Sequence, residues 1–389
     1  MGRMAELAAW SVANSKTAYS KFLSANDTGV TNSHQAGILI AKQASQLMFD
    51  TPGEKGSNKD KQIIVRWQND FTVSSRFIYY GQKTRNEYRM TRFGKDFPFL
   101  KPEYTGALLV LAKMNEEEYD AYVLNREEDI EEFLDDCGIS PAETNRLIGR
   151  DLVHSSDIFK KRGLSEVAEQ FHGMFPESET MSAAAREIYN SEITNRQAVA
   201  DIKLIGYTEL EYRLFRRIEQ DRFGPQIEAG FKDMESFILL ANQIINRRKS
   251  RAGKSLEHHL SALFRENNLE FDSQPVTEGN KRPDFIFPSE HAYHNTLFPV
   301  DKLITLAAKT TCKDRWRQIL NEADRLRDSM KYLCTLQQGI SPAQLEEMRK
   351  EKVTLVVPAP YIQSYPGKYR GMIWPLHRFI DYVHEKEIG

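Results

Sequence analysis

Three charged side chains in the C-terminal half of the chain have the types and spacing that phosphodiester hydrolysis requires. Asp284 follows a proline at the start of a short apolar run, Lys309 ends a later apolar run, and Glu322 lies thirteen residues further on. This reaction needs a divalent cation on the phosphate oxygens, an activated water and relief of negative charge in the transition state. We predict that Asp284 holds the cation and that Lys309 orients the water and neutralises the phosphate.

The acid that the common nuclease pattern places two residues before the lysine is missing, because that position is Ala307. Glu322 can replace it from a helix, since it lies beside an apolar stripe of helical spacing. The stripe consists of Trp316, Ile319, Ala323 and Leu326. Glu257, on a separate predicted helix, is a further candidate acid. Because Mg²⁺ prefers oxygen ligands, the predicted cofactor is Mg²⁺, with Asp284, Glu322 and Glu257 as its candidate ligands.

Each of these residues also has an ordinary structural interpretation. Asp284 could be a turn residue, Glu322 could lie at the surface, and the stem of Lys309 could extend along apolar surface. Spacing alone therefore leaves a catalytic and a structural interpretation open.

The elements that must position these side chains are predicted to form an α/β domain. A helix is expected over 255–264 and strands over 284–287, 303–309 and 353–357, so that helices cover a sheet. The N-terminal part differs, because short β-prone runs at 63–67, 77–80 and 107–112 alternate with turns and predict a small barrel. We predict domains at 1–150 and 186–389, joined by a linker over 151–185.

The distribution of charge is more informative than the net charge of −2 over 389 residues. Basic residues gather at 83–95 and 247–254, and acidic residues at 116–120 and 127–136, which permits a basic cleft. We interpret the acidic runs as solvated faces, the second of them on a helix over 127–134. For the basic runs a solvated face and a binding face remain equally open.

The cysteines and the apolar runs exclude several classes of protein. The three widely spaced cysteines, Cys137, Cys312 and Cys334, argue against a disulfide framework or a zinc site and fit a reducing cytoplasm. No apolar run approaches the length that crosses a membrane. The first twenty residues carry too many charges for a typical signal peptide.

The chain resembles the EcoRII restriction endonuclease family at both ends. The resemblance lies at residues 23–29, 34–35, 81–92, 105–108, 246–257, 277–281, 283–285, 309–324, 347–349 and 355–358. It implies an N-terminal B3-like pseudobarrel that binds DNA and a C-terminal PD-(D/E)XK nuclease domain.

The resemblance also implies the residues of the catalytic domain. The catalytic aspartate, lysine and glutamate of the family fall on Asp284, Lys309 and Glu322. A family tyrosine near the site falls on Tyr293, which could equally be an aromatic residue packed in a loop. The cluster that reads CC/GG in related nucleases falls on Lys313, Asp314 and Arg315. Arginine can donate two hydrogen bonds to guanine and a carboxylate can accept from cytosine, although a charged helix start is the alternative. Further predicted DNA contacts are Arg317, Arg251 and Lys254.

In the N-terminal domain the resemblance implies contacts to a second, effector copy of the DNA site. These contacts fall on His34, Lys83, Arg85, Glu87 and Arg89. The chain departs from the family pattern twice, with Tyr88 in place of a lysine and Leu39 in place of a tyrosine. Either departure could change the affinity for effector DNA or the sequence recognised.

These observations together predict a type IIE-like restriction endonuclease. It would be a homodimer that cleaves double-stranded DNA at a CCWGG-like site and is activated by a second copy of that site. A non-catalytic B3-type DNA-binding regulator is the alternative, and a structure-specific repair nuclease is a third possibility. The trio of Asp284, Lys309 and Glu322 argues for an enzyme, because a protein that only binds DNA has no use for it.

Overall fold

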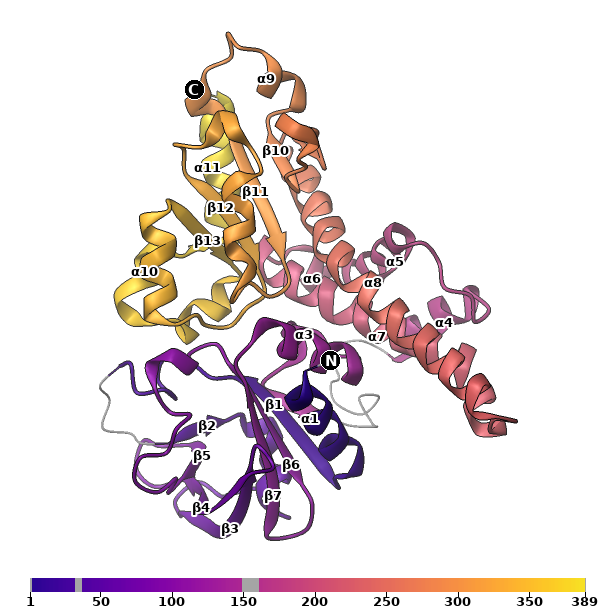
Figure 1. The fold of residues 1–389 in the computed structure, drawn as a ribbon, viewed down its shortest axis with the longest axis vertical. Helices are drawn as coiled ribbons and strands as arrows, with labels where there is room; N and C mark the ends of the chain where they lie inside the picture. The colour runs from indigo at the N-terminus through magenta and orange to yellow at the C-terminus, as the bar shows by residue number, and fades with distance from the viewer. Residues whose placement is uncertain (1, 32–36, 149–160, 389) are drawn as a thin grey trace.

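The computed structural model describes residues 2–31, 37–148 and 161–388, which form two β-sheets with helices on both. Figure 1 shows the sheet of the N-terminal part below, the sheet of the C-terminal part above, and helix α3 between them. Within these residues, none of the helices has the length and apolar character needed to cross a membrane.

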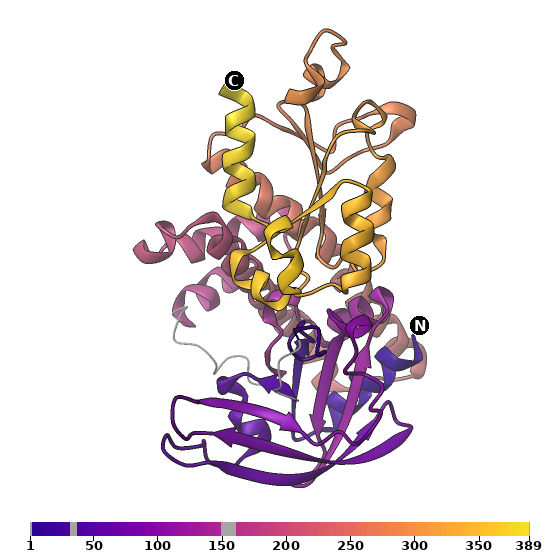
Figure 2. The same ribbon diagram turned by 90° about the vertical axis from the view of Figure 1, so that its left-hand side faces the viewer.

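The first sheet has eight strands in the order β2-β5-β4-β3-β7-β6-β1-β8. Their bounds are Thr17–Phe22 (β1), Ile38–Ile40 (β2), Lys59–Trp67 (β3), Phe71–Tyr80 (β4), Glu87–Thr91 (β5), Leu108–Lys113 (β6), Glu118–Leu124 (β7) and Arg146–Ile148 (β8). All neighbours are antiparallel except β3 and β7. The sheet curls around a core that includes the fully buried Tyr19, Trp67 and Phe77 (Figure 2). The predicted β-rich domain is confirmed, but its sheet is an open, curled one.

Helices α1 (Arg3–Asn14) and α3 (Glu127–Cys137) pack on the outer face of β6 and β7. The short helix α2 (Ser45–Met48) lies against the other face. Helix α3 ends at Gly138, which adopts a left-handed conformation with φ 63°. Glycine has no Cβ that would strain this conformation, so the predicted end of the acidic helix is confirmed.

The second sheet has six strands in the order β14-β13-β12-β11-β10-β9. Their bounds are Asp272–Ser273 (β9), Phe285–Phe287 (β10), Ile304–Lys309 (β11), Lys331–Thr335 (β12), Val353–Val357 (β13) and Trp374–Pro375 (β14). Strands β11 to β14 are parallel, whereas β10 is antiparallel to β11 and β9. The predicted α/β domain is therefore confirmed.

Helices cover the second sheet and extend beyond it. They are α4 (Lys161–Gln170), α5 (Ser178–Asn190), α6 (Ile193–Arg196), α7 (Ala200–Ala229), α8 (Met234–Glu266), α9 (Glu290–His294), α10 (Pro342–Lys350) and α11 (Leu376–Ile388). The predicted apolar stripe of α8 is buried against the sheet, with Leu260, Leu263 and Phe264 fully enclosed. The free end of the α7–α8 hairpin projects away from both sheets (Figure 1).

Two expectations about elements differ from the structure. The described part of the predicted linker over 151–185 is largely helical, because Met181 and Ala185 bury their side chains against neighbouring helices. The helix predicted to carry Glu322 is absent. In its place, 3-10 turns at Arg315–Asn321 and Asp324–Leu326 flank Ala323, whose backbone is extended with φ −146° and ψ 94°.

Candidate active site and nucleic-acid interface

Asp284 and Lys309 lie at the same edge of the second sheet because their strands are antiparallel neighbours. Phe285 pairs with Leu306, so the start of β10 lies beside the end of β11. The Asp284 side chain is largely buried, and its Oδ2 accepts a hydrogen bond of 2.7 Å from the backbone N–H of Ala308. The fold therefore holds Asp284 and Lys309, which are far apart in the sequence, on adjacent backbone segments.

Glu257 on α8 reaches the same place through a shared partner. The side-chain amide of Gln274 donates to Glu257 Oε2 at 2.8 Å and to Asp284 Oδ1 at 2.9 Å. Burial, and then the charge of Asp284, raise the pKa of Glu257, while Gln274 and nearby lysines oppose the increase. Glu257 therefore belongs to the same electrostatic cluster as Asp284.

Glu322 joins this cluster from the turn between the two 3-10 segments. Burial, and secondly the charge of Asp284, raise the pKa of Glu322 to about 7, against the opposing charge of Lys309. The three predicted catalytic side chains are therefore electrostatic neighbours, although Glu322 is held by an irregular segment and not by the expected helix.

The carboxylates at this site are of the chemical type that binds a hard divalent cation. Within the described ranges, no three His, Cys, Asp or Glu side chains lie close enough to form a metal-binding group. However, Mg²⁺ commonly takes one or two carboxylates and keeps several waters. The side-chain amide of Gln274 donates to both Glu257 and Asp284, so it places partial positive charge between the two carboxylates. A cation between them would supply the same kind of charge. Asp284, Glu257 and Glu322 therefore match the predicted cation in donor type, but the three are not gathered into one metal-binding group among the described residues.

Tyr293, predicted near the catalytic residues, is 1% exposed and lies under the segment that carries Glu322. Its hydroxyl donates to the carboxylate of Glu278 at 2.6 and 2.8 Å and accepts from the backbone N–H of Arg325 at 3.2 Å. With its hydroxyl engaged in this way, the tyrosine takes the packed structural position that was the alternative interpretation.

The predicted base-reading cluster contacts the acidic helix α3 of the N-terminal domain. Glu127 accepts from the backbone N–H groups of Asp314 and Arg315 at 2.5 and 2.8 Å, and from Arg315 Nε at 3.1 Å. Glu131 pairs with the same guanidinium, and Lys313 binds Asn125 just before α3. The three predicted DNA contacts are therefore brought together beside α3, but only Lys313 is buried, since Asp314 is exposed and the Arg315 side chain is 42% exposed.

Interpreting the second acidic run as a solvated face was wrong for Glu127, which is 1% exposed. Its carboxylate occupies the N-terminal end of a 3-10 turn, where backbone N–H groups and positive side chains attract anions. Burial lowers the pKa of Lys313 to about 8, despite the favourable charge of Asp314. A buried lysine costs free energy to keep charged.

A cavity of 620 Å³ separates α3 from the catalytic residues. Lys309, Glu257 and Lys249 line it from the catalytic domain, and Glu131 and Asp135 line it from α3. Acidic side chains of the N-terminal domain and basic side chains of the catalytic domain thus line one space beside Lys309.

The other predicted contacts of the catalytic domain fall in different surroundings. Arg317 is exposed and pairs with Glu347. Lys254 is exposed on α8. Arg251 is 7% exposed and stacks on Tyr212, with its guanidinium carbon 3.6 Å from the ring centre, so the structure does not support it as a surface DNA contact.

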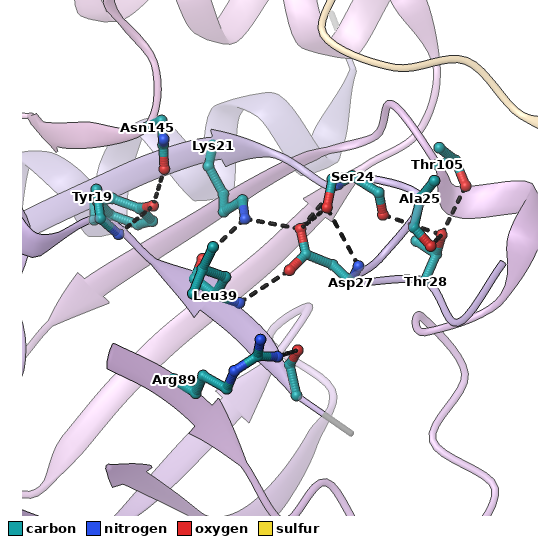
Figure 3. Close-up of polar contacts among 12 residues, drawn as sticks. Tyr19, Lys21, Ser24, Ala25, Asp27, Thr28, Leu39, Arg89, Thr105 and Asn145 are labelled. Carbon is teal, nitrogen blue, oxygen red and sulfur yellow. Dashed lines mark hydrogen bonds and ion pairs between the residues drawn. The ribbon is translucent and has the colours of Figure 1, made fainter. Parts of the chain in front are cut away.

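The predicted effector residues divide into exposed and buried groups. Lys83 and Arg85 are exposed in the β4–β5 connection, whereas Arg89 is 4% exposed and pairs with Glu87 at 3.2 Å on the same strand face. His34 lies outside the described residues. Figure 3 shows Arg89 below Leu39, its partner in the β2–β5 register.

The two departures from the family pattern have different consequences. Tyr88 points into the core, where its hydroxyl accepts from the backbone N–H of Gly53 at 2.8 Å, so it offers no surface to DNA. Leu39 is 39% exposed. A buried ion pair of 2.7 Å between Lys21 and Asp27 holds the Leu39 backbone through both its N–H and its C=O (Figure 3).

Comparisons with known proteins identify the family to which the chain belongs. Residues 12–145 match the family described as Restriction endonuclease EcoRII, N-terminal, and residues 215–380 match the family described as EcoRII C terminal. The Type II restriction enzyme EcoRII of Escherichia coli is 39% identical over 384 residues, which cover 93% of this chain and 92% of that protein. The chain belongs to the EcoRII family of type II restriction enzymes. The predicted recognition and enzyme class, a site-specific deoxyribonuclease, are thereby confirmed.

Two solved structures are more distant from this EcoRII-family chain. Metal-depleted Ecl18kI in complex with uncleaved, modified DNA is 15% identical, with a TM-score of 0.44, over 58% of this chain and 83% of that one. The restriction endonuclease PspGI–substrate DNA complex is 17% identical, with a TM-score of 0.44, over 59% and 97%. Both are too distant to bear on the site residues.

Sequence reasoning missed three residues that contact the predicted site residues. Gln274 carries no charge and sits in no motif, so only the structure reveals its two carboxylate partners. Glu127 and Glu131 were visible as an acidic run. Charge complementarity with Lys313 and Arg315 could have identified them. This signal can be used only when the two segments are known to be in contact.

Proposed function

We propose that this chain is a Mg²⁺-dependent endonuclease that cleaves double-stranded DNA at a CCWGG-like site and is activated by a second copy of the site. The observation that carries the proposal is the edge of the second sheet where Asp284 and Lys309 lie on adjacent strands. Glu257 and Glu322 share the electrostatic environment of these two residues. This arrangement fits a PD-(D/E)XK domain in which the missing strand acid is replaced by Glu322.

The chemical roles follow from the type and place of each side chain. Asp284 and Glu322 would hold Mg²⁺, with Glu257 as a further acid. When bound, this cation polarises the phosphate and lowers the pKa of a water molecule. Lys309 supplies a positive charge beside the carboxylates, where it can orient that water and offset the negative charge that develops on the phosphate.

Sequence recognition would come from Lys313, Asp314 and Arg315. The guanidinium of Arg315 can donate to guanine O6 and N7, and the carboxylate of Asp314 can accept from cytosine N4. Arg317 and Lys254 are exposed cations that can contact phosphates without reading sequence. All of these contacts require that α3 leaves the surface.

The contact of α3 supports autoinhibition by the N-terminal domain. Glu127 and Glu131 place carboxylates on the groups that would otherwise meet DNA, so the same surface cannot hold α3 and DNA together. In this proposal the curled sheet is a B3-like effector domain, and effector DNA bound around Lys83, Arg85 and Glu87 favours release of α3.

A homodimer is proposed because a near-palindromic site calls for two matching subunits. The projecting end of the α7–α8 hairpin supports it. Large apolar side chains are exposed there, namely Ile227, Phe231, Met234, Phe237, Ile238 and Leu239. An apolar patch of this kind suits burial against another protein surface. We place the protein in the cytoplasm, where DNA and Mg²⁺ are both available.

The test is a plasmid digest with and without Mg²⁺, comparing the wild-type chain with Lys309→Ala. We expect discrete fragments with Mg²⁺ and a loss of more than about 100-fold in rate for Lys309→Ala. Sequencing the fragment ends identifies the site. Smeared products would indicate a nuclease without sequence specificity, and absence of cutting by the wild-type chain would favour the regulator that only binds DNA.

A further inference from the structure

Glu322 lies where a regular segment ends: its backbone N–H donates to the C=O of Ile319 at 3.4 Å, and the chain then leaves the helical conformation. Glu322 follows one 3-10 turn, and the extended residue Ala323 separates it from the next. A side chain on such irregular backbone keeps its place only if other parts of the fold hold the segment, because active-site geometry is sensitive to shifts of roughly 1 Å.

The loop that precedes Asp284 supplies these contacts. Thr277, which is 4% exposed, donates its hydroxyl to the backbone C=O of Glu322 at 2.7 Å. The adjacent Glu278 accepts from the backbone N–H of Asp324 at 3.2 Å. Two consecutive residues of one loop therefore hold the backbone on both sides of Ala323.

Tyr293 also holds this loop in place. Its hydroxyl binds both carboxylate oxygens of Glu278 and accepts from the backbone N–H of Arg325. The neighbouring ion pair between Lys281 and Asp324, at 3.0 Å, ties the loop to the Glu322 segment a second time.

The same loop continues directly into the strand that Asp284 begins. The backbone N–H of Thr277 donates to the C=O of Lys281 at 2.9 Å, which closes the loop three residues before Asp284. The two carboxylates that would share the cation are thus connected through a short, hydrogen-bonded piece of chain.

We propose that Thr277 and the Glu278–Tyr293 pair are positioning residues that set the place of Glu322 relative to Asp284. Tyr293 then acts on cleavage through Glu278 and the backbone, and does not touch the DNA. The inference rests on the proposed function of Glu322 and Asp284 as ligands of the divalent cation.

The test compares Thr277→Val, which keeps the shape but removes the hydroxyl, with Thr277→Ser, which keeps the hydroxyl. Removing groups that orient a metal ligand typically lowers activity or metal affinity by about 10- to 100-fold. We expect that loss in kcat for Thr277→Val with KM for DNA unchanged, and recovery to near the wild-type rate in Thr277→Ser. Tyr293→Phe should lower kcat in the same way.

A second readout avoids cleavage altogether. Without DNA, the Mg²⁺ concentration that half-maximally raises the melting temperature should increase for Thr277→Val and Tyr293→Phe. Thr354→Val, which alters a buried threonine on β13, is the matched control and should leave both readouts unchanged.

The proposal and the underlying function fail in different ways. Wild-type kcat and an unchanged Mg²⁺ response in Thr277→Val would overturn the positioning role, as would equal damage in Thr277→Ser. If Thr277→Val does not fold, Tyr293→Phe decides the question through the same two measurements. Absence of Mg²⁺-dependent cleavage by the wild-type chain would instead overturn the proposed function.

Discussion

At the scale of single residues, the carboxylates around Lys309 differ in how they are held. Asp284 is fixed by the backbone N–H of Ala308, whereas Glu257 is linked to it only through the side chain of Gln274. Fixed groups are better suited to bind a cation directly, because less side-chain freedom is lost on binding. We therefore assign Asp284 the larger contribution to cleavage.

This difference in how Asp284 and Glu257 are held predicts unequal effects when each carboxylate is replaced by its amide. Asp284→Asn should lower the single-turnover cleavage rate by more than about 1000-fold, since loss of a metal ligand removes several kcal/mol of transition-state stabilisation. Glu257→Gln should cost about 10- to 100-fold. Rapid-quench measurement of both variants at saturating Mg²⁺ checks the order. Equal losses would make Glu257 a direct ligand, and no loss in Glu257→Gln would remove it from the site.

At the scale of elements, a buried polar network joins the three helices behind the catalytic sheet. Glu211 on α7 accepts from Ser182 on α5 at 2.6 Å and lies 2.9 Å from His259 on α8. Burial alone would raise the pKa of Glu211, but His259, Arg251 and Ser182 outweigh it and bring the pKa down to about 2. The carboxylate therefore stabilises the folded state in its ionised form.

The sign of this shift predicts sensitivity to acid. Because the folded pKa lies below the unfolded value, the stabilisation is complete above about pH 4.5 and is lost as the pH falls towards 2. Glu211→Gln should lower the free energy of unfolding by about 3 kcal/mol at neutral pH and flatten this part of the pH dependence. Urea unfolding at several pH values tests this, with the exposed Glu179→Gln as control. An unchanged acid response in Glu211→Gln would contradict the assignment.

Several elements could be predicted from the sequence because their signal is local. The strands at 304–309 and 353–357 are apolar runs ended by a lysine or a proline, and Gly138 ends α3 as its type suggests. The backbone around Glu322 could not be predicted correctly, because the apolar stripe that suggested a helix is also compatible with 3-10 turns. Contacts from outside the segment hold these turns in place. Local periodicity does not contain those contacts.

At the scale of the whole molecule, the two halves meet through polar groups as well as through α3. Gln337 donates to the C=O of Gly106 at 2.8 Å, and Arg216 pairs with Glu143 at 2.6 Å. A side chain at Gly106 would collide with the backbone C=O of Gly339, 2.0 Å from an added Cβ. The sequence predicted a second domain and its segregated charges, but not that an acidic run of one domain contacts Arg315 of the other.

Polar and charged contacts join α3 to the catalytic domain, among them those of Glu127 and Glu131 with Arg315. Charge pairs at an interface of this kind contribute a few kcal/mol each when they are shielded from water. In the proposed mechanism, effector DNA would have to favour the released state by a comparable amount to activate the enzyme.

Cleavage of a plasmid with one recognition site is the measurement that tests most directly whether α3 occupies the DNA-binding face. The double variant Glu127→Gln/Glu131→Gln should cut this plasmid at least about 10-fold faster than the wild-type chain, because the neutral amides no longer pair with Arg315. Added effector DNA should then accelerate it little. Glu128→Gln, on the same helix but 80% exposed in its side chain, should behave as wild type. A double variant as slow as wild type on one site, and still dependent on added DNA, would contradict the assignment of α3 as the inhibitory element.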